Sequence, residues 1–293
     1  MQSFATFHPI VLFFYYMIVM TMTVFIMHPF VLILSIIGSL FFYAFLTPYK
    51  TIVRDLGFYI LVFFLISVTN PIFVHKGETI LFYLNDNPVT VEAFIYGFMI
   101  ATMLVAVIFW SKSYSSIMTS DKFIYLFGKM IPKLSLIISM ALRFIPRFKH
   151  QILKVNQTQK TLGIYTSNSI TDRIMSGIRT FNSVVMWSME NAISQADAMK
   201  ARGYGLKGRT NFSLFRWYSR DTITLAIMFC MFILVLYFNS RGALSFNYYP
   251  TLTVIDVSRI NFFHFFVVFI LFTLPSFIEL KENLQWKYLK SKI

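Results

Sequence analysis

The chain has 293 residues, of which 57% are hydrophobic and 19% aromatic, while only 13% are charged. Soluble domains carry about 25% charged residues, so this composition excludes an ordinary soluble globule and predicts a polytopic membrane protein. A net charge of +14 would suggest nucleic-acid binding in a soluble protein, but in a membrane protein it indicates basic loops, and we expect no nucleic acid partner.

Six apolar segments are predicted to cross the membrane as helices. They cover residues 10–27, 30–46, 56–74, 91–110, 222–238 and 262–278. Polar loops are expected between the second, third and fourth of them, and Pro71 is expected to end or kink the third. The first residues lack the basic stretch and cleavage site of a secretory signal, so we expect the first segment to be retained. The predicted fold class is therefore all-α, with about six transmembrane helices.

The middle of the chain departs from this apolar pattern. Residues 134–142 are apolar but too short to span, and they predict a helix at the membrane surface that ends near Pro146. Residues 148–163 predict a basic, Gln-rich helix, and a turn is expected at residues 166–168. Residues 170–202 have apolar positions at helical spacing and predict a long amphipathic helix.

The distribution of charge predicts the orientation of the chain. Between Arg143 and Arg220 there are thirteen Lys and Arg residues but only three acidic ones. By the positive-inside rule this segment is expected to be cytoplasmic, and six spans then place both termini on the same cytoplasmic side. We expect a multi-pass protein of the cell membrane whose basic residues partly contact anionic lipid headgroups of the bilayer.

The segment that ends the amphipathic helix is the most informative polar stretch. Gly203 and Gly205 are typical of residues just past a helix C-terminus, so the tip presents Ala201, Arg202 and Gly203. An Arg at that place suits the negative end of the helix dipole, and its planar guanidinium offers five donors to carboxylates or carbonyls of a partner.

Residues 198–205, Ala-Met-Lys-Ala-Arg-Gly-Tyr-Gly, resemble the signature of the transmembrane T component of energy-coupling factor (ECF) transporters, the CbiQ/EcfT family. Leu142-Arg-Phe-Ile-Pro146, the Gln-rich run at residues 157–160 and the Asn70-Pro71 region resemble other parts of that family. The resemblance implies two cytoplasmic helices, each with an Ala-Arg-Gly-like tip that binds a groove on one of two ABC-type ATPase subunits. It also implies a third partner, a small substrate-binding membrane protein called the S component.

The first tip departs from the family pattern. The chain reads Lys160-Thr161-Leu162-Gly163 where the resemblance implies Ala-Arg-Gly, so Leu162 replaces the Arg. Either the alignment is displaced, or this tip contacts its ATPase through shape and apolar surface, with Lys160 as the alternative source of charge. Because a buried, charge-assisted hydrogen bond contributes a few kcal/mol, we expect two unequal contacts, with the stronger at Arg202.

No motif for catalysis or for metal or cofactor binding stands out. The chain has no P-loop and no His-Glu-x-x-His motif, its five histidines are scattered, and its single cysteine, Cys230, lies in an apolar run. We expect no catalytic residues, no metal and no cofactor, and a non-enzymatic transport subunit whose partners hydrolyse ATP.

These observations favour three parts, with N-terminal transmembrane helices over residues 1–110, a cytoplasmic coupling module over 111–220, and C-terminal transmembrane helices with a basic tail over 221–293. The resemblance implies a coupling subunit of a prokaryotic importer for vitamins or metal ions, with the S component contacting the spans and residues 134–142. Two alternatives stay open. One is a polytopic membrane enzyme acting on lipids, and the other is an ABC permease half that itself forms the substrate path.

Overall fold

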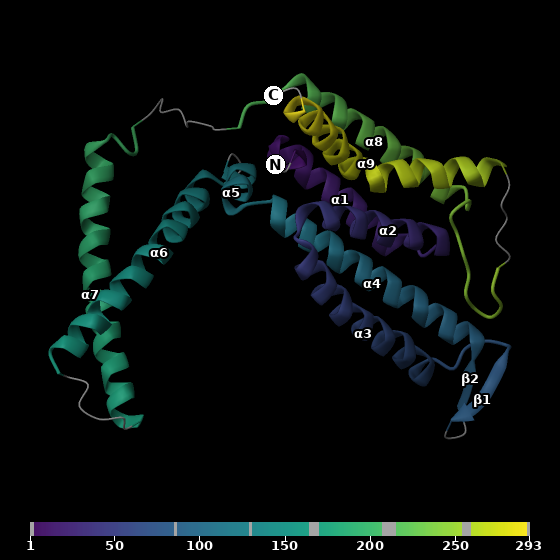
Figure 1. Ribbon diagram of the computed structural model, residues 1–293, viewed down its shortest axis with the longest axis horizontal. Coiled ribbons are helices and arrows are strands. Elements are labelled where there is room, and N and C mark those ends of the chain that lie inside the picture. Colours follow the sequence, from purple (N-terminus) through teal and green to yellow (C-terminus); the bar gives the residue numbers. More distant parts are fainter. Residues whose placement is uncertain are drawn as a thin grey trace. The chain divides into compact units, whose positions relative to one another are not determined.

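The structure is a computed structural model that describes residues 3–84, 87–128, 131–163, 170–206, 215–253 and 259–291 (Figure 1). The chain divides into two compact units, one made of Met1–Lys122 with Phe215–Ile293 and the other of Phe123–Leu214. The described residues are mostly helical, with one short pair of strands, which confirms the predicted all-α class.

The first unit consists of the apolar helices at the two ends of the chain. Its elements are η1 (Phe4–Thr6), α1 (Pro9–Phe25), α2 (Pro29–Leu46), α3 (Tyr49–Phe73), β1 (Ile80–Leu84), β2 (Asn87–Thr90), α4 (Val91–Ile117), α8 (Ser219–Ser240) and α9 (Arg259–Lys290). Among the described residues, α2, α3, α4, α8 and α9 are long and apolar enough to cross a membrane. The sixth expected span, α1, is apolar but has 17 residues, about 26 Å of helix, against a hydrocarbon core of about 30 Å.

Several helices extend beyond their predicted ends. The polar residues expected in a loop before the third span form the first turns of α3, and α4 continues to Ile117, past the expected end at Trp110. The expected polar loop at residues 75–90 contains an antiparallel pair, β1 and β2. Pro71 does not end α3, which continues to Phe73. The proline lies in the last turn of the helix and removes only one backbone donor.

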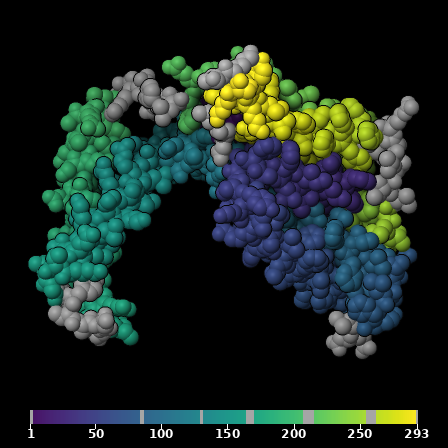
Figure 2. Space-filling model, viewed as in Figure 1, coloured from purple at the N-terminus to yellow at the C-terminus, as the bar shows by residue number. Residues whose placement is uncertain are grey.

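A buried aromatic cluster around Trp110 forms the core of the first unit. The indole is fully buried, and its Nε1 donates a hydrogen bond to Ser35 Oγ at 3.1 Å. Four aromatic rings have centroids 6.0–6.4 Å from it, those of Tyr15, Tyr16, Phe42 and Phe272. These rings come from α1, α2 and α9, so one side chain of α4 joins four helices. Figure 2 shows α1 and α2, in purple, enclosed between α9 in yellow-green and α3 and α4 in blue.

Close backbone approach at two glycines makes this packing possible. A Cβ added at Gly38 of α2 would lie 3.0 Å from the backbone oxygen of Phe272 in α9. A Cβ at Gly97 of α4 would lie 2.7 Å from the backbone oxygen of Ser67 in α3. Both helix pairs therefore depend on the missing side chain, as is common where membrane helices pack closely.

Two buried carboxylates, one from α8 and one from α9, hold the N-terminal turn in place. Glu279 Oε1 of α9 accepts a hydrogen bond from the Phe4 backbone N–H at 2.9 Å, and Asp221 Oδ1 of α8 accepts one from His8 at 3.3 Å. Lys122 Nζ donates to the Ala5 carbonyl at 2.7 Å and to that of Ile117 at 3.0 Å. Burial lowers the pKa of Lys122, and these two carbonyls supply the hydrogen bonds that its ammonium group loses from water.

The second unit is built on two long amphipathic helices, α6 (Pro132–Thr161) and α7 (Ile170–Ala201), preceded by α5 (Ser120–Gly128), which begins in the first unit. The prediction of two separate helices before residue 163 is wrong, because α6 continues through Pro146. Pro146 removes only the hydrogen bond to the Leu142 carbonyl, and the helix is continuous on both sides of this position. The turn expected at residues 166–168 lies outside the described residues, whereas the long helix predicted over 170–202 is confirmed.

Candidate coupling site

A chain of hydrogen bonds joins α6 to α7. Ser176 Oγ donates to Gln159 Oε1 at 2.7 Å, Gln159 Nε2 donates to Thr180 Oγ1 at 3.3 Å, and Thr180 Oγ1 donates to Asn156 Oδ1 at 2.9 Å. Gln159, Ser176 and Thr180 are the buried residues of the second unit, as far as the structure describes it. The polar crossing, as we call these four residues, is therefore the best-shielded contact of the helix pair.

Aromatic side chains make a second contact between the same helices. Phe148 of α6 lies edge-on to Trp187 of α7, with ring centroids 6.1 Å apart, and Phe144 stacks on Phe148 one turn earlier. Pairing of Phe148 with Trp187 and of Gln159 with Ser176 shows that the two helices run antiparallel. Arg202 follows Trp187 by 15 residues, so the end of α7 extends about 22 Å beyond this contact.

The end of α7 has the hydrogen-bond pattern of a Schellman cap. Gly203 has a φ of +78°, its N–H donates to the Lys200 carbonyl at 2.9 Å, and the Tyr204 N–H donates to that of Met199 at 3.0 Å. Glycine suits the place because a side chain is strained at positive φ. The cap satisfies the last carbonyls of the helix, and it leaves Ala201 and Arg202 exposed at the tip.

The end of α6 shares the positive φ and the glycine hydrogen bond of this cap but carries a different side chain. Gly163 has a φ of +67°, and its N–H donates to the Lys160 carbonyl at 3.2 Å. Thr161 is the last helical residue, and Leu162 occupies the position that Arg202 occupies on α7. The two tips thus read Lys-Thr-Leu-Gly and Lys-Ala-Arg-Gly in one register. Leu162 is 68% exposed, a large value for an apolar side chain.

A basic groove lies beside the α6 tip. Its volume is about 580 Å³, and it opens between the two helices. It is lined by Gln151, Lys154, Val155, Thr158, Gln159, Leu162, Arg179, Asn182 and Ser183. Of these, Leu162 is the apolar residue nearest the tip, whereas Lys154 and Arg179 supply positive charge. The groove can accept carboxylates or backbone carbonyls of a partner next to an apolar contact.

The structure places the seven predicted site residues at the ends of two helices of one unit, four on α6 and three on α7. Sequence reasoning missed the polar crossing, although it noted the Gln-rich run that contains Gln159. The signal was present, because Asn156 and Gln159 are three residues apart and Ser176 and Thr180 four apart, which puts each pair on one helix face. A pairing between two helices cannot be derived from either helix alone.

Comparison with known proteins identifies the family. Residues 3–214, more than half of the chain, match the family model CbiQ, described as cobalt transport protein. A relative from Listeria innocua, named energy-coupling factor transporter transmembrane protein EcfT, is 33% identical over 179 residues, which is 56% of this chain and 68% of that protein. A Staphylococcus aureus protein of the same name is 28% identical over 193 residues, covering 61% of this chain and 72% of the relative.

Proposed function

Because the chain belongs to the CbiQ family and is the transmembrane component of an energy-coupling factor transporter, we propose that it passes movement from two ABC-type ATPase subunits to a small substrate-binding membrane protein. The cargo of the complete transporter would be a vitamin or a metal ion, recognised by the substrate-binding partner. In this proposal the chain binds neither ATP nor cargo, and its second unit together with both termini lies on the cytoplasmic side of the cell membrane.

One observation carries the proposal, namely that α6 and α7 each end in an exposed tip whose glycine has a positive φ and donates its N–H to the carbonyl three residues back. A capped tip is rigid and presents few unsatisfied carbonyls, so it can enter a groove on a partner at low cost. Small residues beside the protruding side chain, Ala201 and Gly203, let the backbone of a partner approach. We assign one tip to each of two ATPase subunits.

The two tips differ in the side chain that they present, and we infer that they bind unequally. Arg202 offers a charged, planar fork of donors, and hydrogen bonds to a charged group contribute about 1.5–3 kcal/mol each. Leu162 offers apolar area only, while Lys160 and the basic groove supply the nearest positive charge. The α7 tip is therefore the stronger attachment, and the α6 tip is the one more dependent on shape.

The polar crossing makes the two tips move together. A hydrogen bond fixes direction as well as distance, so a chain of three of them resists sliding of α6 along α7 better than apolar contact does. Movement of either tip by an ATPase would then turn the helix pair as one body. The exposed polar and basic surface of the pair suits contact with soluble subunits.

The start of α6 supplies an apolar surface for the substrate-binding partner. Leu134, Ile137 and Ile138 are 48%, 60% and 37% exposed. A groove of about 220 Å³ lies between this segment and α5, lined by Phe123, Ile124, Phe127, Ile131, Leu134, Ser135 and Ile138. Exposed apolar area of this kind marks a surface that another protein or the membrane covers. We assign this apolar surface to contact with the substrate-binding protein, which would also contact lipid-facing membrane spans of the chain.

The test is co-purification of the tagged full chain in mild detergent, followed by identification of its companions. The proposal expects two ATPase subunits and a small hydrophobic protein, and isolation of the chain alone would contradict it. Arg202→Ala is expected to lower ATPase affinity about tenfold to hundredfold, more than Leu162→Ala does. Equal losses would overturn the unequal contacts. Arg173→Ala, an exposed Arg at the other end of α7, is the matched control, and Leu162→Arg is expected to strengthen retention.

A further inference from the structure

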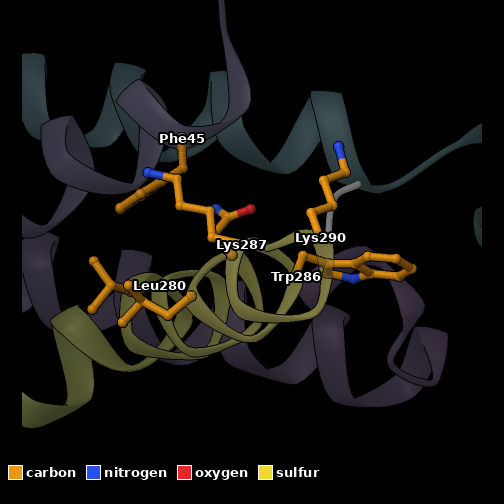
Figure 3. Close-up of a pocket in the computed structure, with 7 residues that line it drawn as sticks. Phe45, Leu280, Trp286, Lys287 and Lys290 are labelled. Carbon is orange, nitrogen blue, oxygen red and sulfur yellow. The ribbon is translucent and has the colours of Figure 1, made fainter. Parts of the chain in front are cut away.

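A groove in the first unit lies where the ends of α2 and α9 meet. Its volume is about 470 Å³, and it is lined by Phe45, Leu280, Asn283, Leu284, Trp286, Lys287 and Lys290. Figure 3 shows Lys287 and Lys290 extending from the same side of α9, with Lys287 next to the ring of Phe45. The tip contacts of the second unit involve none of these residues, so the groove has no part in the function proposed above.

The groove joins an apolar stripe to a basic one. Phe277, Leu280, Leu284 and Lys287 follow each other at three- and four-residue steps on α9, so they occupy one face of the helix. Phe277 and Leu284 are 56% and 58% exposed. Because α9 is long and apolar enough to cross a membrane, this face passes from hydrocarbon to the membrane surface along its length.

The charge in the groove has one sign. None of the seven lining residues is acidic. In the described residues the ion pairs involve Asp55, with Arg54 and Lys112, and neither lysine of the groove takes part in one. Two lysines one turn apart on α9, beside an apolar floor, are complementary to a phosphate that carries an acyl chain. Trp286 is 47% exposed beside them, and tryptophan is enriched where hydrocarbon meets water.

We propose that this groove binds an anionic phospholipid. The phosphate lies between Lys287 Nζ and Lys290 Nζ, and Asn283 offers a further donor to the headgroup. An acyl chain follows Leu284, Leu280 and Phe277 along the exposed side of α9. A free phosphate would satisfy the lysines but would leave this apolar floor, with Phe45, uncovered, so the lipid is the better complement.

Native mass spectrometry of the full chain with its co-purifying subunits tests the site. The probes are dioleoyl phosphatidylglycerol and dioleoyl phosphatidylcholine, which share acyl chains and differ in headgroup charge. The wild-type protein is expected to retain the anionic lipid at least about fivefold more than the neutral one, and Lys287→Gln/Lys290→Gln is expected to abolish that preference. Each single variant is compared with Lys281→Gln, which removes the same charge from an exposed position of α9 outside the groove.

Four results would overturn the proposal. Equal retention of both lipids, or equal effects of Lys287→Gln and Lys281→Gln, would show that the groove does not select the headgroup. Displacement of the lipid by millimolar glycerol 1-phosphate would show a site for soluble phosphate instead. Loss of a protein subunit from the double variant, with the lipid preference unchanged, would show that the groove is a protein contact.

Discussion

The two units bury opposite kinds of side chain. In the unit made of the two chain ends, the fully buried set is dominated by rings and branched chains around Trp110, drawn mainly from α1, α2, α4, α8 and α9. In the unit of α6 and α7, the described buried residues are Gln159, Ser176 and Thr180, all polar and all in one hydrogen-bond chain. Large apolar residues of that second unit, such as Phe181 and Met186, are 68% and 72% exposed.

This difference separates a unit that holds itself together from one that depends on its surroundings. Apolar burial stabilises by about 25 cal/mol per Å² of area removed from water, whereas a hydrogen bond contributes about 1 kcal/mol net. A helix pair with almost no buried apolar area is therefore weakly stable alone. Its exposed apolar residues are available to partners and membrane, so binding supplies the burial that the pair lacks.

The largest expected effect comes from removing the centre of the aromatic core. Trp110→Ala deletes a fully buried indole and should cost about 3–5 kcal/mol, enough to prevent a stable fold. Trp286→Ala removes the same group from a half-exposed place and should cost less than about 1 kcal/mol. Thermal unfolding of both variants in detergent checks this. Similar losses would show that the Trp110 cluster does not support the unit.

A smaller effect is expected at the polar crossing. Gln159→Leu leaves the Ser176 hydroxyl without its acceptor and removes the donor to Thr180 Oγ1, which keeps its bond to Asn156, and should cost about 1–3 kcal/mol of the helix contact. Backbone hydrogen exchange at the crossing should then accelerate about tenfold to hundredfold. Gln157→Leu, at an exposed position of α6, is the control and should leave exchange unchanged.

A variant with an apolar crossing sharpens the same comparison. In Gln159→Leu/Ser176→Ala/Thr180→Val the buried trio has no polar side chain left, and only the half-buried Asn156 loses a partner. Stability should therefore largely recover, since apolar replacement of both partners is nearly neutral. ATPase-linked transport should recover less than stability, because the directional bonds between the helices are gone. Complete recovery of both would show that the crossing has no role in transmission.

The smallest effects on stability are expected at two glycines, one inside α7 and one just past its end, and they should have opposite signs. Gly203→Ala places a side chain at a φ of +78° and should cost about 1–2 kcal/mol at the tip. Gly177→Ala, in the helix interior where an added Cβ meets nothing within 4 Å, should stabilise by about 0.5–1 kcal/mol. Circular dichroism and hydrogen exchange of the last helical turn measure both. A destabilised Gly177→Ala would mean that the open side of α7 is covered.

Much of this fold follows from hydropathy and local signals. Five of the six expected spans correspond to helices long enough to cross a membrane, and the long helix ending before Arg202 was predicted from apolar spacing and its glycines. The predicted break of α6 at Pro146 was wrong. A proline removes only one backbone hydrogen bond of a helix, and the neighbouring turns decide whether the helix ends there. Polar residues at the start of α3 and the end of α4 also looked like loops.

The tips themselves could be placed from sequence, since Gly163 and Gly203 are local signals for a helix end. That both glycines take a positive φ and donate to the carbonyl three residues back could not be derived in this way, because backbone angles and hydrogen bonds are set by the folded chain. The polar crossing and the groove beside α9 could not be predicted from the sequence for a related reason. Each is made by residues of two helices, and a pattern within one helix does not name its neighbour.

The hydrogen bonds that fasten the first turn of the chain have a consequence for its biosynthesis. Phe4 is held by Glu279 and His8 by Asp221, at sequence separations of 275 and 213 residues. While the ribosome is still making α8 and α9, the N-terminal turn has no acceptors, and Tyr15 has no Leu271 carbonyl to bind. The α6–α7 hairpin meets no such delay, because its partners are separated by at most 39 residues, as between Phe148 and Trp187. Synthesis therefore allows the α6–α7 pair to form before the packing of the first unit can be completed.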